Sequence, residues 1–219
     1  MASDNSSTPR PLTFALPTPT PTYTTHAVPL SLLNTVLDAA FTKALSPESY
    51  PGGLPALLSA HRFADAVPLG AHWSHKYLLD IDGMAYSARF MAFLASDSVP
   101  IKATVYDEFW ESWIEPWLHY IPLSSTYDEI YNIYAYFSGP PRAALEYLNA
   151  SVPQGEGGDK YAAWRPRDGD RRLRRIARAG KQWKRSVGRP VDMEGVLPEL
   201  ALEWARICAD DRDAMGFVL

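Results

Sequence analysis

The 219-residue sequence has one cysteine, no long apolar run and no excess of positive charge. The single Cys208 excludes an internal disulfide framework, and we expect it to be a small core residue on an apolar helix face. No stretch approaches the roughly 20 apolar residues of a membrane span, and no apolar signal segment follows a basic start. The net charge of −4 gives no indication, for the protein as a whole, of binding to nucleic acid or to an anionic membrane.

Apolar residues, in contrast, are plentiful. The hydrophobic content of 47% and the aromatic content of 12% suffice for a packed core, and the length allows one sizeable domain with tails. Residues 1–29 are rich in Ser, Thr and Pro, so we predict a disordered tail. Residues 30–70 contain helical patterns broken by Pro and Gly, typical of a helical remnant or a linker. We place the folded domain at 71–219, with a surface loop at 151–169.

Short apolar segments alternate with helical patterns in the folded part. The segments 77–81, 98–102 and 119–123 predict strands. Helices are predicted from Ser87 onward, with Phe90, Phe93 and Leu94 on one face, and over 109–117 and 126–137. This alternation predicts an α/β fold with a Rossmann-like parallel sheet and flanking helices.

Two further helices are predicted after the loop. The first, at 170–187, has its apolar residues Leu173, Ile176, Ala177 and Gly180 facing inward. Eleven Arg and Lys residues fall within 165–189, a pattern that suits nucleic acid or phospholipid headgroups, although a solvated helix face is the favoured interpretation. The last helix has an apolar stripe over 193–208, and we expect Pro198 to kink it or reset its start.

The stretch Asp80–Phe90 combines a strand end, a Gly turn and a helix start. Ligands of open parallel sheets bind beyond the carboxyl ends of the strands, and helix N-termini favour phosphate. Ser87 is a good N-cap, and Arg89 supplies a guanidinium for two phosphate oxygens. Residues two apart in a helix point roughly 200° apart. Ser87 and Arg89 therefore share one diphosphate only if the helix begins at Ser87.

Several other residues have more than one interpretation. Asp80 and Asp82 suit a metal-binding pair, although strand-end and turn roles are favoured because hard cations usually need further oxygen ligands. Three tryptophans suit sugar stacking, but their helical spacing favours packing; they are Trp110, Trp113 and Trp117. Four histidines lack metal-ligand spacing with cysteine, and we expect surface or packing roles for His26, His61, His72 and His75.

Several motifs in order resemble the CAP10 family of glycosyltransferases, which includes a capsule xylosyltransferase and protein O-glucosyltransferases. They are Lys76-Tyr-Leu-Leu-Asp-Ile-Asp-Gly83, Ser87-Ala-Arg-Phe90, Leu94-Ala-Ser-Asp-Ser-Val-Pro-Ile-Lys102 and Pro116-Trp-Leu-His-Tyr-Ile-Pro-Leu123. Gly180-Lys-Gln-Trp183 and Leu202-Glu-Trp-Ala-Arg206 are similar to the tail of fungal members. The resemblance covers about residues 73–217, with an interruption near 140–170.

The resemblance implies the C-terminal, donor-binding half of a GT-B glycosyltransferase with extra C-terminal helices. It implies a UDP-sugar, such as UDP-xylose or UDP-glucose, as donor, and inverting transfer to a sugar or protein hydroxyl without a metal or other cofactor. The donor-binding residues would be Asp82, Gly83, Ser87, Arg89, Phe90, Lys102, His119 and Tyr120. Ser87 and Arg89 would hold the diphosphate, aided by backbone amides after Gly83.

The sequence also departs from the family. Members carry a longer N-terminal half that binds the acceptor and supplies a catalytic Asp as base, and residues 1–70 are too short and Pro-rich for it. We therefore name no catalytic residue and expect a missing N-terminal domain as a partner. The alternative is a truncated, inactive fragment that binds nucleotide or packs on a partner. The family implies the secretory pathway, but the sequence does not indicate the compartment, the sugar, the acceptor, the linkage or the oligomeric state.

Overall fold

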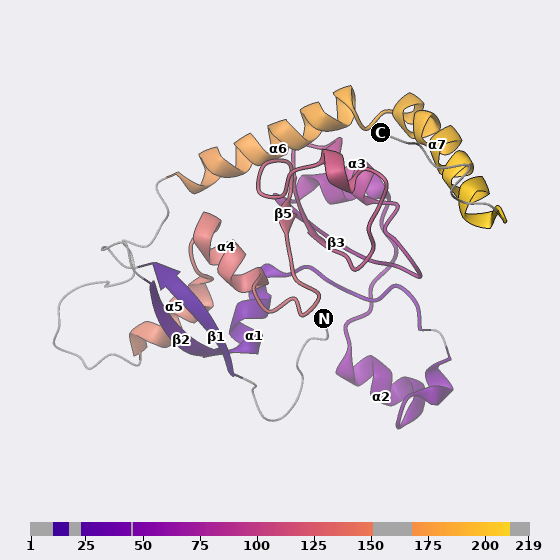
Figure 1. Ribbon diagram of the computed structural model, residues 1–219. Helices are drawn as coiled ribbons and strands as arrows, with labels where there is room; N and C mark the ends of the chain where they lie inside the picture. Colours follow the sequence, from indigo (N-terminus) through magenta and orange to yellow (C-terminus); the bar gives the residue numbers. More distant parts are fainter. Residues whose placement is uncertain (1–10, 18–22, 45, 151–167, 211–219) are drawn as a thin grey trace. The chain divides into compact units, whose positions relative to one another are not determined.

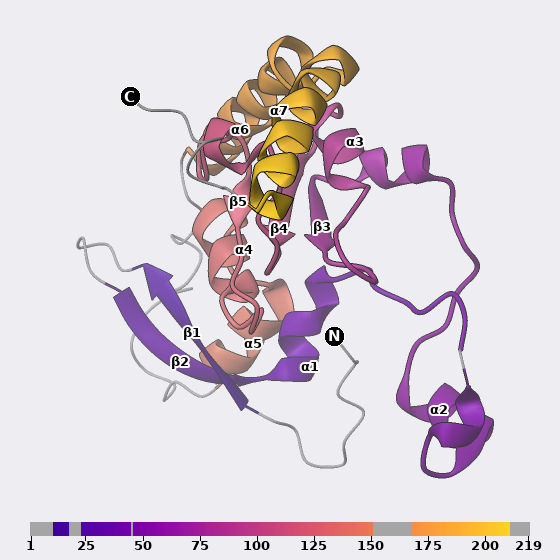
Figure 2. The ribbon, with the colours of Figure 1, turned by 45° about the vertical axis from the view of Figure 1, so that its right-hand side comes forward.

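The computed structural model describes residues 11–17, 23–44, 46–150 and 168–210. Its internal contacts divide the chain into two compact units. Figures 1 and 2 show the helices and strands, coloured along the sequence. Unit 1 consists of residues 1–72 and 126–173, and unit 2 of residues 73–125 and 174–219. The division predicted from the sequence assigned residues 126–173 to the second part, whereas the structure groups them with the N-terminal residues.

Unit 1 contains an antiparallel hairpin of β1 (Pro11–Pro17) and β2 (Tyr23–Pro29), in which Phe14 pairs with His26. These described residues fall within the tail that was predicted to be disordered, so that prediction is wrong for them. The Ala15 N–H donates to Asn132 Oδ1 of a helix in the same unit at 2.8 Å. A contact 117 residues away in the sequence is not visible in local composition, which is why the hairpin was missed.

Unit 1 also contains short helices. They are α1 (Leu30–Leu33), the 3₁₀ turns η1 (Asn34–Val36) and η2 (Pro47–Ser49), α2 (Gly53–Ala60), α4 (Ile130–Ser138) and α5 (Arg142–Ala150). Of these, α1, α4 and α5 contact the hairpin. Their core is apolar, with Val28, Leu33, Ile130, Ile133, Phe137 and Ala144 buried. Helix α4 agrees with the helix predicted over 126–137, although it begins later, at Ile130.

Unit 2 is built on a three-stranded parallel sheet with the order β3-β4-β5. The strands are β3 (Tyr77–Ile81), β4 (Val99–Ala103) and β5 (Ile121–Pro122). Tyr77 pairs with Val99, and Ile101 pairs with Ile121. Since sequential strands are adjacent and parallel, their carboxyl ends lie at one edge of the sheet (Figure 2). The predicted α/β class and parallel sheet are confirmed.

Helix α3 (Phe90–Leu94) connects the first two strands and buries Phe90, Phe93 and Leu94, as the sequence predicted. The helix predicted over 109–117 is wrong, because only the 3₁₀ turn η4 (Glu111–Trp113) forms there. Trp110 and Ile114 still enter a core cluster with Phe90, Leu94 and Trp183. Trp110 is therefore a packing residue, as its spacing predicted. Trp113 and Trp117 are 42% and 54% exposed, so the packing role predicted for them does not hold to the same degree.

Two long helices complete the described chain. Helix α6 (Gly169–Ser186) begins in unit 1 and continues into unit 2, and it buries Leu173, Ile176 and Ala177 as predicted. The predicted loop 151–169 lies outside the described residues except for its last two. Helix α7 (Pro190–Cys208) runs unbroken through Pro198, so the helix start is not reset there. No helix among the described residues is long and apolar enough to cross a membrane.

The apolar stripe of α7 is exposed. No residue of α7 is buried, and Leu197, Leu200 and Trp204 are each at least 60% exposed. Cys208 is likewise exposed. The predicted core role of Cys208 is therefore wrong, because a helical apolar pattern creates a core face only where another element packs on it.

Candidate functional site

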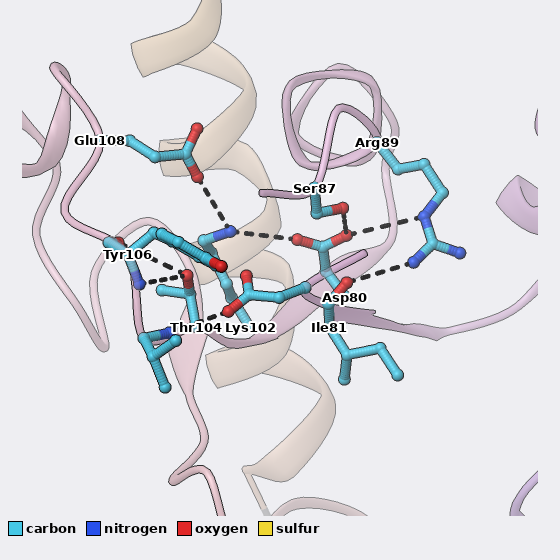
Figure 3. Close-up of polar contacts among 10 residues, drawn as sticks. Asp80, Ile81, Ser87, Arg89, Lys102, Thr104, Tyr106 and Glu108 are labelled. Atoms are coloured by element: carbon cyan, nitrogen blue, oxygen red, sulfur yellow. Dashed lines mark hydrogen bonds and ion pairs between the residues drawn. The ribbon is translucent and has the colours of Figure 1, made fainter. Parts of the chain in front are cut away.

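The candidate site lies beyond the carboxyl ends of β3 and β4 in unit 2, where ligands of parallel sheets bind. A turn follows β3, in which the Gly83 N–H donates to the Tyr86 carbonyl at 3.3 Å. A second loop, residues 104–110, follows β4. In it the Tyr106 N–H donates to Thr104 Oγ1 at 3.1 Å. Figure 3 shows the polar side chains that these two loops and strands bring together.

Asp80 is the centre of this network, and its side chain is fully buried in β3. The Ser87 hydroxyl donates to Asp80 Oδ1, and Lys102 Nζ donates to Oδ2 at 3.2 Å (Figure 3). Arg89 Nε lies 3.9 Å from Oδ1. Burial raises the pKa of the Asp80 carboxyl above its usual range, against the lowering effects of Ser87, Lys102 and, least, Arg89. The carboxylate thus fixes three polar side chains around the end of β3.

Lys102 was predicted to line the donor side, and the structure buries it beneath the site. Its side chain is 2% exposed and its Nζ lies 3.3 Å from Glu108 Oε1 as well as near Asp80. The ammonium also lies over two aromatic rings, 4.6 Å from the centroid of Phe90 and 5.5 Å from that of Trp110. The positive charge of Lys102 therefore faces protein groups. Phe90 is also buried beneath the site, where its ring contacts this ammonium.

Ser87 does not play its predicted local role. Helix α3 begins at Phe90, with Arg89 at the N-cap position and no side-chain cap. Ser87 is instead buried and turned toward Asp80. The prediction of Ser87 as N-cap is wrong because the fully buried Asp80 requires hydrogen-bond donors, and this requirement outweighs capping of a five-residue helix.

Arg89 keeps a large exposed fraction at the same place. Its side chain is 47% exposed, and Nη2 donates to the Ile81 carbonyl at 3.4 Å. Figure 3 shows the guanidinium beside the end of β3, not turned away from it. Two protein oxygens thus orient the guanidinium of a side chain that is about half exposed.

Asp82 and Gly83 follow directly after β3. Asp82 Oδ2 accepts from the Val105 N–H at 2.9 Å, which joins the two loops. Asp82 Oδ1 is buried and has no hydrogen-bond partner among the described residues. A buried carboxylate oxygen without a donor is costly, so this atom is an unsatisfied acceptor directly after β3. At Gly83, an added Cβ would lie 3.3 Å from the Tyr86 carbonyl, so the turn is tight.

His119 and Tyr120 come from the turn before β5. His119 Nδ1 accepts from the Glu115 N–H at 2.8 Å, and burial lowers the pKa of the imidazole despite the opposing effect of Glu115. The Tyr120 ring meets Phe90 edge to face at 5.5 Å, and burial raises the pKa of its phenol. Tyr120 is thus in contact with the residues beneath the site, whereas His119 packs toward Trp183.

The structure therefore gathers six of the predicted residues at the end of β3 or beneath it, namely Asp82, Gly83, Ser87, Arg89, Phe90 and Lys102. The central role of Asp80 and the pairing of Glu108 with Lys102 were missed. Asp80 and Lys102 are register partners on adjacent strands, but the predicted strand 98–102 began one residue too early and would have placed Ile101 opposite Asp80. Within the described residues, no group of three His, Cys, Asp or Glu side chains is placed to hold a metal.

Fold and site together define an α/β protein with a polar, arginine-bearing edge on a parallel sheet. Residues 37–141 match glycosyl transferase family 90. The matched segment contains β3, α3, β4 and β5 and thus every candidate site residue. The match covers 105 of the 219 residues, and the family's description indicates glycosyl transfer as the reaction class of that family.

Proposed function

We propose that unit 2 binds the UDP part of a nucleotide sugar at the carboxyl ends of β3 and β4. In this proposal the chain is the donor-binding half of a GT-B enzyme. UDP-xylose or UDP-glucose is the donor, and a sugar or protein hydroxyl receives the sugar with inversion. The match of residues 37–141 to glycosyl transferase family 90 supports the reaction class, and the geometry around Arg89 supports the donor position.

The accessible guanidinium of Arg89 is the observation on which the proposal mainly rests. Asp80 and the Ile81 carbonyl orient it from the protein side, and the exposed N–H groups are free to bind two diphosphate oxygens. Helix α3 has only five residues, so its dipole contributes less than a long helix would. Arg89 is therefore the main source of positive charge for the leaving UDP, and the proposal needs no metal.

The neighbouring groups suit the rest of a nucleotide sugar. The tight Gly83 turn lets a ligand approach the backbone closely, and Asp82 Oδ1 offers an acceptor to a ligand hydroxyl. In the reaction, the acceptor oxygen attacks the anomeric carbon from the side opposite UDP, its proton passes to a base, and the bond to UDP breaks. No residue described here is assigned as that base.

Calorimetry of UDP with the purified chain tests the proposal. Arg89→Ala removes a charged hydrogen-bonding partner, which costs roughly 1.5–3 kcal/mol, or about 10- to 150-fold in affinity. Arg89→Lys keeps the charge but not the two-pronged geometry, and it should fall between wild type and Arg89→Ala. Arg142→Ala, in which a 92%-exposed arginine is removed from α5, is the matched control. Equal affinities of wild type and Arg89→Ala would refute the site.

A turnover assay separates this proposal from its alternative, an inactive module that only holds nucleotide. Release of UDP from UDP-xylose or UDP-glucose in the presence of sugar and peptide acceptors would support transfer. UDP binding that depends on Arg89, without release of UDP from any donor, would favour the inactive module.

A further inference from the structure

The part of α6 in unit 2 carries its positive charge on one side. At about 100° per residue, an arc of about 120° contains five cations and one glutamine. The four arginines in it are exposed. We call this set the basic face, and its cations are Arg174, Arg175, Arg178, Lys181 and Arg185.

The opposite side of the same helix segment is packed, which fixes the basic face outward. Ile176, Ala177, Gly180 and Trp183 are buried. Gly180 lies so close to the turn before β5 that an added Cβ would be 2.4 Å from the His119 carbonyl oxygen. Trp183 Nε1 donates to the Trp113 carbonyl at 2.8 Å. Rotation of the helix would break these contacts, so the five cations remain on the surface of unit 2.

The charge of the basic face is only partly neutralised. Lys181 Nζ pairs with Asp97 Oδ1 at 2.7 Å. This bond is the main cause of the lowered pKa of Asp97, and Arg185 and Arg178 add to it from farther away. In the part of the chain that the structure describes, no carboxylate forms an ion pair with the four arginines of the face. Five cations against one carboxylate leave an excess of positive charge on a straight ridge of about 16 Å.

We propose that the basic face docks unit 2 on an anionic lipid surface. A plane of headgroups meets all five side chains of a straight ridge at once, and polybasic segments are attracted to such surfaces. The face contains no apolar residue to insert among acyl chains, so the attachment is electrostatic, reversible and sensitive to salt. This inference is independent of the nucleotide site, since none of its residues contacts Asp80 or Arg89.

The packing of α6 argues against nucleic acid as the occupant. A helix that enters the major groove must fit into a channel about 12 Å wide and 8.5 Å deep. Helix α6 lies against the body of unit 2 through Gly180 and Trp183 and offers only its outer side chains. Single-stranded nucleic acid is held by aromatic stacking platforms, and the basic face has no aromatic residue.

Co-sedimentation of the full chain with vesicles tests the inference. We expect binding to phosphatidylcholine vesicles that contain phosphatidylserine, none to phosphatidylcholine alone, and loss of binding at high salt. The triple variant Arg174→Gln, Arg178→Gln, Arg185→Gln should partition about 100-fold more weakly, from the expected contribution of each cation near the surface. The triple variant with Lys at the same positions should retain most of the binding, because its charge is unchanged.

A matched variant removes three arginines elsewhere, with Arg62, Arg142 and Arg206 changed to Gln. It should bind like wild type, and circular dichroism should show that all variants are folded. Three results would overturn the inference: binding to phosphatidylcholine alone, equal losses in the two Gln triples, or duplex DNA that displaces the chain from vesicles and binds through the same arginines.

Discussion

Asp80 and Lys102 are charged residues inside the core of a small sheet, and each depends on the other. Asp80 is fully buried, and Lys102 has only Asp80 and Glu108 as carboxylate neighbours within ion-pair distance among the described residues. Burial of ions is costly, and removal of one member leaves the other uncompensated. Since Asp80 also contacts Ser87 and Arg89, the pair stabilises the shape of the loop that carries the candidate site.

Lys102→Met should therefore destabilise the protein strongly. The Asp80 carboxylate loses its closest cation, and breaking a buried pair from one side costs roughly 3–5 kcal/mol. Chemical denaturation measures the change. Lys181→Met, which breaks the pair with the 86%-exposed Asp97, should change the free energy of unfolding much less, because exposed ion pairs contribute little. The double variant Asp80→Asn, Lys102→Met should be more stable than the sum of its single changes predicts. If the changes in the free energy of unfolding were additive, Asp80 and Lys102 would not be coupled.

The raised pKa of Asp80 has a consequence for pH dependence. The folded state holds this proton more tightly than the unfolded state, whose pKa is near the ordinary 3.8. Proton linkage then lowers the free energy of unfolding as pH rises from about 3.8 through the folded pKa. Wild type should lose stability relative to Asp80→Asn across this window, because the amide does not titrate. Denaturation of both proteins over a pH series measures the difference, and parallel pH profiles would contradict the raised pKa.

Most residues of the candidate site were recognisable from the sequence, but the direction in which each side chain points was not. Arg89 and Asp82 were identified from their motif and lie at the end of β3. Ser87 was identified too, yet it faces inward because a buried carboxylate seven residues earlier takes its hydroxyl. Which side chain satisfies a buried group depends on packing in three dimensions, and spacing along the chain does not determine it.

At the level of elements, α6 is held by a close backbone approach at Gly180. Gly180→Ala would place a Cβ 2.4 Å from the His119 carbonyl oxygen and 2.9 Å from Leu94 Cδ2. Overpacking typically costs 1–3 kcal/mol, which exceeds the gain of roughly 1 kcal/mol for alanine in a helix. We expect net destabilisation in thermal or chemical unfolding, together with altered chemical shifts in the turn at 116–120.

Gly195→Ala in α7 is the matched control, because the added Cβ meets no described atom within 4 Å apart from its own stretch of helix backbone. The helical preference of alanine should then act alone and stabilise α7 by up to about 1 kcal/mol. A loss of stability for Gly180→Ala together with a gain for Gly195→Ala would confirm that the close approach of α6 to His119 requires a glycine at 180. A stabilising Gly180→Ala would contradict the close packing of α6.

The elements that the sequence predicted well have strong local patterns. The run 77–81 became β3 within the same bounds, and the inward positions of α6 were recovered because their helical period is unbroken. The segment 109–117 also has helical spacing, but Trp110 and Ile114 pack into the cluster with Phe90 from a mostly irregular backbone. The β1–β2 hairpin depends on contacts with α4, and these are distant in sequence.

For the whole molecule, the family match and the structural units divide the chain differently. The match covers residues 37–141. It includes all three strands of unit 2 as well as α4 of unit 1, and it ends before α6. The site and the basic face thus lie in one unit but only the site lies in the matched segment, so the two proposals can fail separately.

Placement of the site within unit 2 predicts how UDP changes the stability of the chain. At a concentration 100-fold above its dissociation constant, a ligand that binds only the folded state stabilises it by about 2.7 kcal/mol. Amides of β3 and β4 that exchange through opening of unit 2 should therefore exchange about 100-fold more slowly with UDP. Amides of β2 and α4 should not change, because their contacts belong to unit 1.

Hydrogen exchange read by mass spectrometry resolves these segments in one experiment. The same UDP concentration with Arg89→Ala is the control and should leave β3 and β4 close to their free rates. Slower exchange in β2 and α4 alone would place the nucleotide in unit 1. Equal slowing throughout the chain would show that the units unfold together. Only protection that is concentrated in β3 and β4 and lost with Arg89 agrees with a nucleotide held at the carboxyl edge of the sheet.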